Sequence, residues 1–456
     1  MSNQITRRNV LQSAGAAGIG FWLAGGASAA PSRSPNERLH IAVVGVGGRG
    51  GSTHIGICGK GKASDRQLIA ICDCDRRKVA AKAEQMPGVK TYTDFRRMFD
   101  ELGKDLDAIT VATAPDNNHA NPALWAMTRG KHVYLEKPMA MTVGECRWLA
   151  KVARENKVIT QLGNQHHSEY GFRRAAQLIK AGILGKVTEA HCNIESKTSG
   201  RVWMDAGELA KLPGRQARLP QGTEPVPDWL DWDAWLGPAK FRPFHPGWMF
   251  GGWREFSIAS IGNFHNHWVD APYMALDLKY PVTVEAIGRR TDPLLDAAIS
   301  VRYTFAARGD QPAVAVYWHG AGTGPTAEML EGVTRTSTGK QPYQVLFIGE
   351  KGRMAAGFGT EPQLLPEATF KDVKLPEPEK GSGGHSELWI KGIRNNTHCE
   401  CDFHDYAQYL GEGAPLGLVA FWAGGKIDWD GPNMKATNCP EADAWLAREF
   451  RKEWKP

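Results

Sequence analysis

The sequence predicts a two-domain α/β protein, and three observations support this. The chain has 456 residues, 42% of them hydrophobic and 23% charged, which is too long for one ordinary core and too apolar for a disordered chain. A glycine-rich loop follows the first apolar strand of the chain body. Strands and helical segments then alternate up to about residue 165, as a doubly wound parallel sheet requires.

The composition excludes several classes of protein. Lys plus Arg number 55 and Asp plus Glu 49, a net charge of +6 without a dense basic stripe, so we expect no nucleic-acid partner, although acidic ligands are permitted. The 51 Gly and 27 Pro carry no period, which excludes a fibrous protein. The eight Cys include no C-x-x-C pair, and the histidines show no complete ligand spacing, so we expect no metal site.

Residues 1–29 have the pattern of a twin-arginine export signal. The pair Arg7-Arg8 precedes a small-residue apolar run at 14–24, and Ala27-Ser28-Ala29 matches a cleavage site. The run is too short and Gly-rich to span a bilayer, which takes about 20 apolar residues. We therefore expect a protein exported in folded form to the periplasm or beyond, without stable membrane insertion and with thiols rather than disulfides.

After a linker at 30–38, residues 39–165 are predicted to form a Rossmann dinucleotide-binding domain. The apolar strand 39–44 leads directly into a G-x-G-x-x-G loop, Gly45-Val46-Gly47-Gly48-Arg49-Gly50. Its first Gly allows a tight turn, the second lets the backbone approach a diphosphate, and the third permits close strand–helix contact. The helix that follows directs its amide groups at the phosphates.

A second apolar strand, 68–72, ends in Asp73, which lies 23 residues after the last glycine of the loop. An acid at this distance accepts hydrogen bonds from the adenosine ribose and repels a 2′-phosphate. The cofactor is therefore predicted to be NAD. Arg76 and Arg77 keep NADP possible, because a nearby cation tolerates that phosphate.

Two more strands complete the domain. The strand 108–113 ends at Ala114-Pro115, where small residues leave room for a dinucleotide. The strand 132–135 ends in Glu136-Lys137-Pro138. A cation at the carboxyl edge of a parallel sheet lies where ligands bind.

This order of motifs resembles the glucose–fructose oxidoreductase, inositol dehydrogenase and MocA (Gfo/Idh/MocA) family. The remaining motif is A-T-x-P-x-x-x-H, read from Ala112 to His119 with Ala114 inserted before Pro115, and later markers are 163–165, 262–270, 429–430 and 438–442. The C-terminal markers resemble an exported branch of the family. The motifs and the resemblance together assign these residues to the cofactor: Gly45, Gly47, Gly48, Arg49, Gly50, Asp73, Ala114, Pro115, His119, Glu136 and Lys137.

The resemblance implies that residues 166–456 form an α+β domain with a large, open, mostly antiparallel sheet. Strand-like runs at 282–287, 298–303, 313–318 and 344–348 are compatible with this. One face of such a sheet supports subunit contacts in the family, so we expect a homo-oligomer.

The groups expected to react are Lys137, His267, Asn263, Asp270 and His265. Oxidation of a secondary alcohol needs a base for the hydroxyl proton, and His267 is our first choice, with Lys137 as its electrostatic and hydrogen-bonding partner. Family members commonly carry Asp where Asn263 stands. Asn263 orients a hydroxyl but takes no proton, so His265 is a candidate for the missing acid–base group. Asn263 and Asp270 are expected to position substrate.

Aromatic residues point to a sugar substrate. Trp229, Trp232 and Trp235 lie among aspartates, and Trp248, Trp253 and Trp268 follow. Sugars present C–H faces to aromatic rings and hydroxyls to polar groups. Any one of these Trp is more commonly a core residue, so the set is informative only beside the family resemblance.

Three functions follow from the sequence. The first is an exported NAD-dependent oxidoreductase acting on a sugar or sugar derivative. The second is an NAD-dependent glycosidase, in which transient oxidation permits elimination of the aglycone before the hydride returns. The third is a sugar-binding protein that retains its nucleotide, which the loss of Asp at Asn263 favours.

Overall fold

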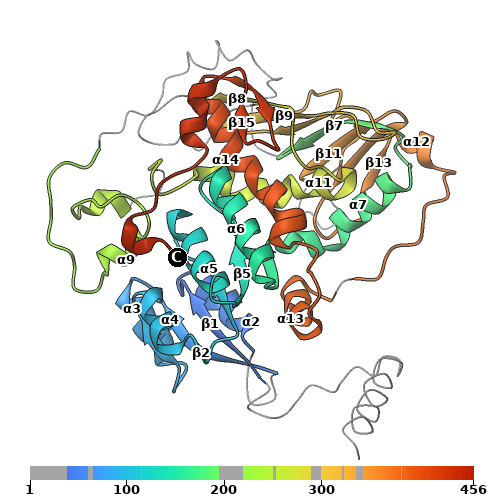
Figure 1. Ribbon diagram of the computed structural model, residues 1–456. Coiled ribbons are helices and arrows are strands. Elements are labelled where there is room, and N and C mark those ends of the chain that lie inside the picture. The colour runs from blue at the N-terminus through green and yellow to red at the C-terminus, as the bar shows by residue number, and fades with distance from the viewer. Residues whose placement is uncertain are drawn as a thin grey trace, which may run out of the picture.

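The structure is a computed structural model that describes residues 38–59, 65–114, 116–194, 219–249, 253–288, 299–320, 323–334, 343–381 and 383–456. The predicted signal at 1–29, nearly all of the linker and Pro115 lie outside the described residues. The described chain forms two sheets, one below the other in Figure 1, with helices between and around them.

The first sheet is parallel throughout and has six strands in the order β3-β2-β1-β4-β5-β6. This is the Rossmann strand order, which places ligands at the carboxyl ends of the strands where the order reverses beside β1. The strands are β1 (Leu39–Val44), β2 (Arg66–Cys72), β3 (Lys90–Tyr92), β4 (Ala108–Val111), β5 (His132–Glu136) and β6 (Thr160–Gly163).

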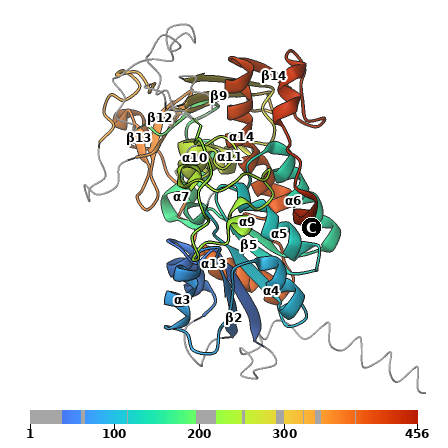
Figure 2. The same ribbon diagram turned by 90° about the vertical axis from the view of Figure 1, so that its left-hand side faces the viewer.

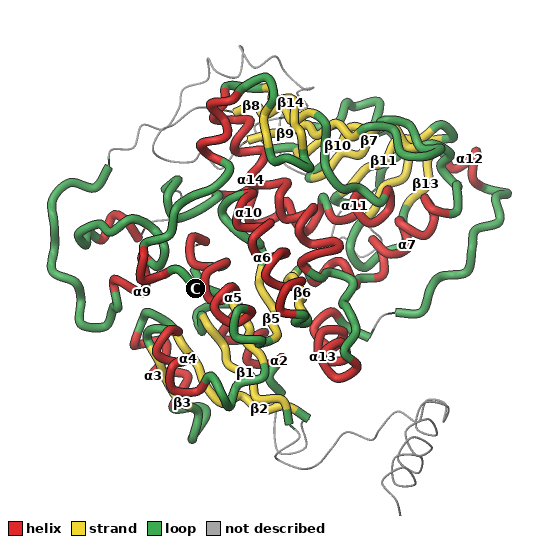
Figure 3. The backbone as a smooth tube through the Cα atoms, viewed as in Figure 1, coloured by secondary structure: helices red, strands yellow, loops and turns green. Residues whose placement is uncertain are grey.

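Helices cover both faces of this sheet (Figure 3). Short polar side chains set their starts: Asp75 accepts from the Arg77 amide at the first turn of α3, and Thr142 forms a capping box with Glu145 at α6. The helices are α2 (Ile55–Ile57), α3 (Arg76–Ala83), α4 (Phe95–Leu102), α5 (Ala120–Met127) and α6 (Val143–Asn156).

The second sheet has nine strands in the order β13-β12-β11-β7-β10-β9-β8-β14-β15. Only β7 and β10 pair in parallel, so the predicted mostly antiparallel sheet is confirmed. The strands are β7 (Val187–Cys192), β8 (Thr283–Gly288), β9 (Ile299–Phe305), β10 (Val314–Trp318), β11 (Val345–Gly349), β12 (Gly352–Ala356), β13 (Gln363–Leu365), β14 (Lys426–Asp430) and β15 (Lys435–Ala436).

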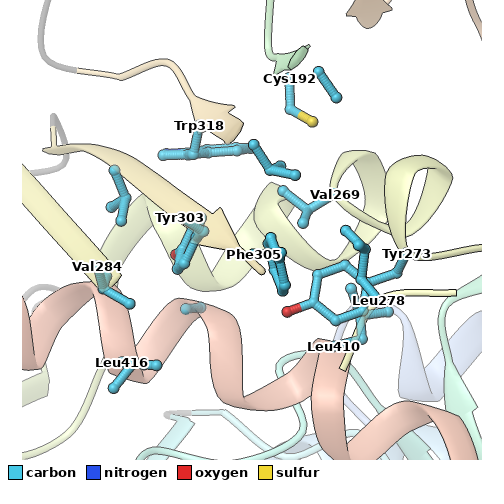
Figure 4. Packing of buried hydrophobic residues seen from close by; sticks show 14 of the residues in the cluster. Cys192, Val269, Tyr273, Leu278, Val284, Tyr303, Phe305, Trp318, Leu410 and Leu416 are labelled. Atoms are coloured by element: carbon cyan, nitrogen blue, oxygen red, sulfur yellow. The ribbon is translucent and has the colours of Figure 1, made fainter. Parts of the chain in front are cut away.

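Four helices pack between this sheet and the first domain (Figure 2). They are α7 (Tyr170–Lys180), α10 (Ala259–Trp268), α11 (Asp270–Leu276) and α14 (Gln408–Ala423). Figure 4 shows Tyr303 and Phe305 of β9 facing Leu410 and Leu416 of α14, all of them buried. The apolar core therefore fixes α10 and α11 against the sheet, and these helices carry the second group of predicted site residues.

Segments late in the chain complete the cores of the first domain. Trp389 of α13 (His385–Asn395) is fully buried in one cluster with Ile41 of β1. Trp454 is fully buried in a second cluster, and the Asn121 carboxamide donates to its carbonyl at 2.7 Å. The other α-helices of the described residues are α9 (Trp232–Leu236) and α12 (Glu367–Phe370).

All eight cysteines are free thiols, as the sequence predicts. Within the described ranges, no helix combines the length and apolarity that a bilayer crossing demands.

Candidate active site at the carboxyl edge of the first sheet

The glycine loop after β1 is closed on its inner side and open on its outer side. Gly45 has φ +88°, and a Cβ there would collide with the Ala112 carbonyl. A Cβ on Gly50 would collide with the Gly45 carbonyl. A Cβ on Gly48, at φ +45°, would meet nothing within 4 Å. The loop therefore offers an open backbone surface that fits a diphosphate.

Asp73 stands at the end of β2 and ties this loop to the sheet. Its Oδ2 accepts from the Val46 amide at 3.0 Å, and its Oδ1 accepts from the Asp75 amide at 3.0 Å. The carboxylate is thus held beside the glycine loop, where an adenosine ribose lies in Rossmann domains.

Arg76 and Arg77, which left NADP as a possible cofactor, already have partners within the protein. Arg76 donates from its side chain to the Asp228 carbonyl. Arg77 pairs with Asp75 at 2.8 Å, and its guanidinium lies 3.6 Å from the ring centroid of Trp229. Neither arginine is free to pair with a 2′-phosphate without breaking these contacts, which favours NAD over NADP.

Glu136, the last residue of β5, is the centre of a buried polar cluster. Its Oε1 accepts from Arg49 Nε at 2.8 Å and from Gln165 Nε2 at 2.7 Å, and lies 3.3 Å from His54 Nε2. Burial favours a raised pKa, but His54, Arg49 and Gln165 together lower the pKa of Glu136 to about 2. The carboxylate is therefore ionised and holds Arg49 across the mouth of the glycine loop.

Lys137 follows in the loop after β5. Burial lowers its pKa from the ordinary lysine value, although the negative charges of Glu136 and Asp116 oppose the shift. A lysine of lowered pKa exchanges a proton more readily near neutrality than an exposed one.

His119 is buried beneath these loops. Its Nδ1 lies 2.8 Å from the Pro138 carbonyl, and its Nε2 lies 2.6 Å from the Thr113 carbonyl. Both ring nitrogens thus face the backbone, so His119 braces the loops after β4 and β5 rather than presenting a nitrogen to the open side.

His267 lies in α10 against His166, with ring centroids 4.7 Å apart. Burial, then the neighbouring His166 and Lys137, hold the pKa of His267 well below its usual range. Burial and the charges of Arg49 and Lys137 lower the pKa of His166 to about 4. Both imidazoles are therefore neutral near pH 7, so each has a ring nitrogen that can accept a hydrogen bond.

Asn263 lies one helical turn before His267, and it is exposed. A Cβ on the neighbouring Gly262 would lie 3.4 Å from the Pro138 ring. The start of α10 therefore approaches the loop that carries Lys137. His267 lies close enough to Lys137 for that lysine to lower its pKa, and Asn263 lies one turn earlier on the same helix.

Asp270 is completely buried. Its two carboxylate oxygens each lie 3.1 Å from His167 Nδ1, and the Tyr406 hydroxyl donates to Oδ1. Asp270 therefore orients His167 beneath the site, which replaces the expected direct contact with substrate.

His265 is also completely buried, in the core of the second domain. Its ring centroid lies 5.6 Å from those of Tyr303 and Trp318. Burial lowers its pKa to about 3. We therefore correct the prediction that His265 supplies an acid–base group: helical spacing turns it to the opposite side of α10 from its neighbour at 267.

Four of the tryptophans predicted as a sugar platform lie in one buried apolar cluster: Trp232, Trp235, Trp248 and Trp253. Trp232 and Trp235 stack on each other at 4.7 Å, and Trp235 lines a small cavity with Gly45 and Asp73 of the first domain. Trp248 and Trp253 line a cavity of about 650 Å³ together with Trp422 and Trp445. A single aromatic platform beside Lys137 is therefore not formed.

Several buried polar atoms around the site make no hydrogen bond within the described part of the chain. They include Oδ1 and Nδ2 of Asn164, Oε1 of Gln165 and Nδ1 of His267. Unpartnered buried polar atoms are uncommon, and they cluster where a ligand supplies the partner. The site thus fits a polar ligand beside Lys137, and the glycine loop and Asp73 fit the dinucleotide.

Sequence reasoning missed the supporting residues His54, His166, His167 and Tyr406. The pair His166-His167 directly follows the family marker 163–165, which was the one local signal available. Two sets of potential metal ligands occur in the described ranges: His167 with Asp270 and Cys401, and His398 with Asp402 and His404. In the first set, the carboxylate of Asp270 is already hydrogen-bonded to His167 and to the Tyr406 hydroxyl.

A parallel Rossmann sheet, a glycine loop, a strand-end acid and a lysine facing a second α/β domain define a dinucleotide-dependent oxidoreductase fold. Two family models match in agreement with this. The model described as oxidoreductase family, NAD-binding Rossmann fold, covers residues 39–164, and the one described as oxidoreductase family, C-terminal alpha/beta domain, covers 176–456. The chain belongs to the Gfo/Idh/MocA oxidoreductase family, and its N-terminal domain is an NAD-binding domain.

Curated relatives are similar over part of their length. A glycosyl hydrolase family 109 protein from Solibacter usitatus is 32% identical over 203 residues, which is 41% of this chain and 45% of that protein. An inositol 2-dehydrogenase from Salmonella typhimurium is 26% identical over 155 residues, 34% of this chain and 45% of that protein. The chain thus spans about half the length of the curated relatives it matches.

Solved structures share the fold across most of the chain. The WlbA dehydrogenase from Bordetella pertussis, in complex with NADH and UDP-GlcNAcA, has a TM-score of 0.55 at 18% identity and covers 86% of this chain and 99% of its own. An inositol dehydrogenase homologue from Azotobacter vinelandii, with NADH and myo-inositol, has a TM-score of 0.51 at 16% identity and covers 87% and 99%.

Proposed function

We propose that this protein oxidises a secondary hydroxyl of a sugar or sugar derivative with NAD. The observation that carries the proposal is the meeting of Lys137 and His267, two nitrogen bases of lowered pKa, at the carboxyl edge of an NAD-binding sheet. Relatives and structural neighbours named for inositol and nucleotide-sugar chemistry support a polyhydroxylated substrate.

The chain supplies the proton chemistry of this reaction. NAD, when bound, would supply the acceptor for the hydride of the carbinol carbon. Lys137 donates a hydrogen bond to the substrate oxygen and stabilises negative charge on it, while neutral His267 takes the hydroxyl proton. Asn263 orients a neighbouring hydroxyl from the exposed end of α10. The C–H bond gives up its electron pair as hydride and the O–H bond its proton, so a ketone forms.

A redox-neutral glycosidase is the second candidate. The relative named as a glycosyl hydrolase is the observation that favours it. In that reaction the same ketone acidifies the adjacent C–H, the aglycone leaves by elimination, water adds, and the hydride returns to carbon. A sugar-binding protein with a retained nucleotide is the third candidate, and Asn263, which cannot take a proton, favours it.

We further propose that the protein acts after twin-arginine export, as a homo-oligomer. Arg7-Arg8 and the cleavage pattern at Ala27-Ser28-Ala29 support export. The open nine-stranded sheet offers a broad face for subunit contact.

One experiment separates the three functions. Purified protein is incubated with a panel of free sugars and of aryl glycosides, while NADH absorbance and aryl release are followed together. Net NADH, or reduction of an added ketose, supports the oxidoreductase. Aryl release without net NADH supports the glycosidase. Solvent deuterium entering a sugar C–H in an NAD-dependent manner rejects the binding protein, and the absence of all three signals across the panel contradicts both enzymes.

A further inference from the structure

A segment of the second half of the chain, Asp228–Gly237, lies on the carboxyl edge of the first sheet. We call it the tryptophan segment. Figure 1 shows its helix α9 beside the C-terminal end and near α3 and α4. The Arg76 amide donates to the Trp229 carbonyl at 2.8 Å, and the Asp231 amide donates to the Cys74 carbonyl at 2.9 Å. One end of the tryptophan segment is thus joined to the loop that carries Asp73.

The other end of the tryptophan segment is joined to the loop after β4. The carboxamide of Asn117 donates to the Leu236 carbonyl at 2.8 Å, and that of Asn118 donates to the Ala234 carbonyl at 2.9 Å. Gly237, at φ +53°, lies so close that a Cβ there would stand 2.6 Å from Asn118 Oδ1. The segment therefore bridges the two loops between which the adenosine of a dinucleotide lies in Rossmann domains.

A cavity lies beneath this bridge, and the tryptophan segment forms its outer wall through Ala234 and Trp235. Its inner wall includes Gly45, Asp73 and Ala114, three residues predicted to contact the cofactor. The cavity is small, about 30 Å³. Trp235 therefore narrows the space into which an adenine ring would enter.

Charged contacts outside the cavity hold the segment in place. Arg451 Nη1 donates to Asp233 Oδ1 at 2.6 Å, and its Nη2 donates to the Gly237 carbonyl at 2.6 Å. Arg96 lies 3.3 Å from Asp233 on the other side. Because these bonds involve charged groups and partly buried side chains, breaking them slows any outward movement of the segment.

We propose that Ala234 and Trp235 form the outer wall of the adenosine site and that the tryptophan segment controls entry and exit of the dinucleotide. NAD is then exchanged slowly, because the segment detaches before the adenosine half leaves. This assignment rests on NAD binding alone and stands whether the protein oxidises, hydrolyses or only binds a sugar.

The test measures nucleotide exchange rather than turnover. Protein carrying NAD is mixed with excess isotopically labelled NAD, and mass spectrometry follows the bound nucleotide with time. Trp235→Ala removes the wall, and Arg451→Ala loosens the segment without touching the cavity. We expect both substitutions to accelerate exchange at least about tenfold, since each removes a contact of a size that changes rates by that factor.

Arg242→Ala is the matched control. Its side chain pairs with Glu255 at 2.7 Å, and only its backbone carbonyl contacts the segment, through Trp232 Nε1. Exchange in this variant should stay within about twofold of the parent. The uptake of NAD by nucleotide-depleted Trp235→Ala protein should accelerate as well, because the wall also blocks entry. Exchange that is unchanged in both Trp235→Ala and Arg451→Ala would overturn the proposal, even if one of them folds poorly.

Discussion

His166 and His267 lie edge to face, with their ring centroids 4.7 Å apart, although one follows the last strand of the first sheet and the other lies in a helix of the second domain. Their contact is where the two halves of the site meet. Because Lys137 lowers the pKa of both, protonation of any one of the three groups disfavours protonation of the other two.

Lys137→Ala should lower kcat by about 10²–10⁴, the range for loss of a positioned proton-transfer group. The bound NAD is measured in parallel after denaturing release, and kcat is calculated per NAD-loaded protein, because Lys137 is also among the predicted cofactor residues. Lys137→Arg is the matched control, because it keeps the positive charge but does not give up a proton near neutrality. Recovery of turnover in the arginine variant would assign Lys137 an electrostatic role alone, and full turnover in the alanine variant would remove it from the reaction.

Protein purified without added nucleotide should contain NAD and not NADP, because Arg76 and Arg77 are occupied by partners of their own. Asp73→Ser should weaken NAD binding at least about tenfold, since a charged acceptor of the Val46 amide and of the ribose is lost. Chromatography of released nucleotide measures both. Asp65→Asn, at the opposite end of β2, is the control and should leave the NAD content unchanged.

The free energy of unfolding should fall as the pH drops from about 6.5 toward 4. Burial lowers the pKa of His265 and His319 to about 3, and of His166 and His385 to about 4. The unfolded chain takes up protons at these histidines below about pH 6.5 while the folded chain does not, so stability is lost in that window. Each of these four histidines is expected to lower the free energy of unfolding by roughly 2 kcal/mol at pH 5, compared with neutral pH.

Thermal unfolding between pH 5 and 8 checks this expectation. A variant such as His319→Gln should show a shallower pH dependence than the parent, because one of the four groups no longer titrates. Equal slopes in the two proteins would contradict the assignment of a buried neutral imidazole.

Tyr406→Phe should destabilise the protein by about 1–2 kcal/mol, because Asp270 loses a hydrogen-bond donor in a fully buried position. Urea unfolding measures the change. Tyr92→Phe, which removes a hydroxyl bonded to Glu101 in a more exposed place, should cost less. A larger loss at Tyr92 than at Tyr406 would contradict the greater contribution assigned to the buried bond to Asp270.

The sequence is most informative where function depends on neighbours along the chain. The glycine loop, Asp73 and Glu136-Lys137 are each joined to a strand that ends beside them, so a parallel sheet brings them to one edge once the strands are identified. The α10 residues followed from the resemblance of the stretch 262–270 to the family. The resemblance did not show which side of the helix His265 occupies, and two residues from His267 it faces the core, not the site.

Other parts of the site depend on contacts between distant residues, which no local pattern reveals. The tryptophan segment meets Asp75 through Leu230, more than 150 residues later in the chain. Its aromatic residues suggested a sugar platform, because residue type alone does not show where in the fold a side chain lies. Likewise, the partners of Asp270 come from the short helical segments that follow β6 and precede α14, so their convergence emerges only from the packing of the second domain.

The burial of Trp454 inside the first domain also constrains how the protein is made. Residues 39–165 leave the ribosome early, but the cluster that holds Phe95 and Met98 lacks the Trp454 side chain until residue 454 has been translated. A nascent or prematurely terminated chain therefore presents an unfinished nucleotide-binding half. The packing of this nucleotide-binding half is thereby coupled to the synthesis of a segment almost 300 residues further along the chain.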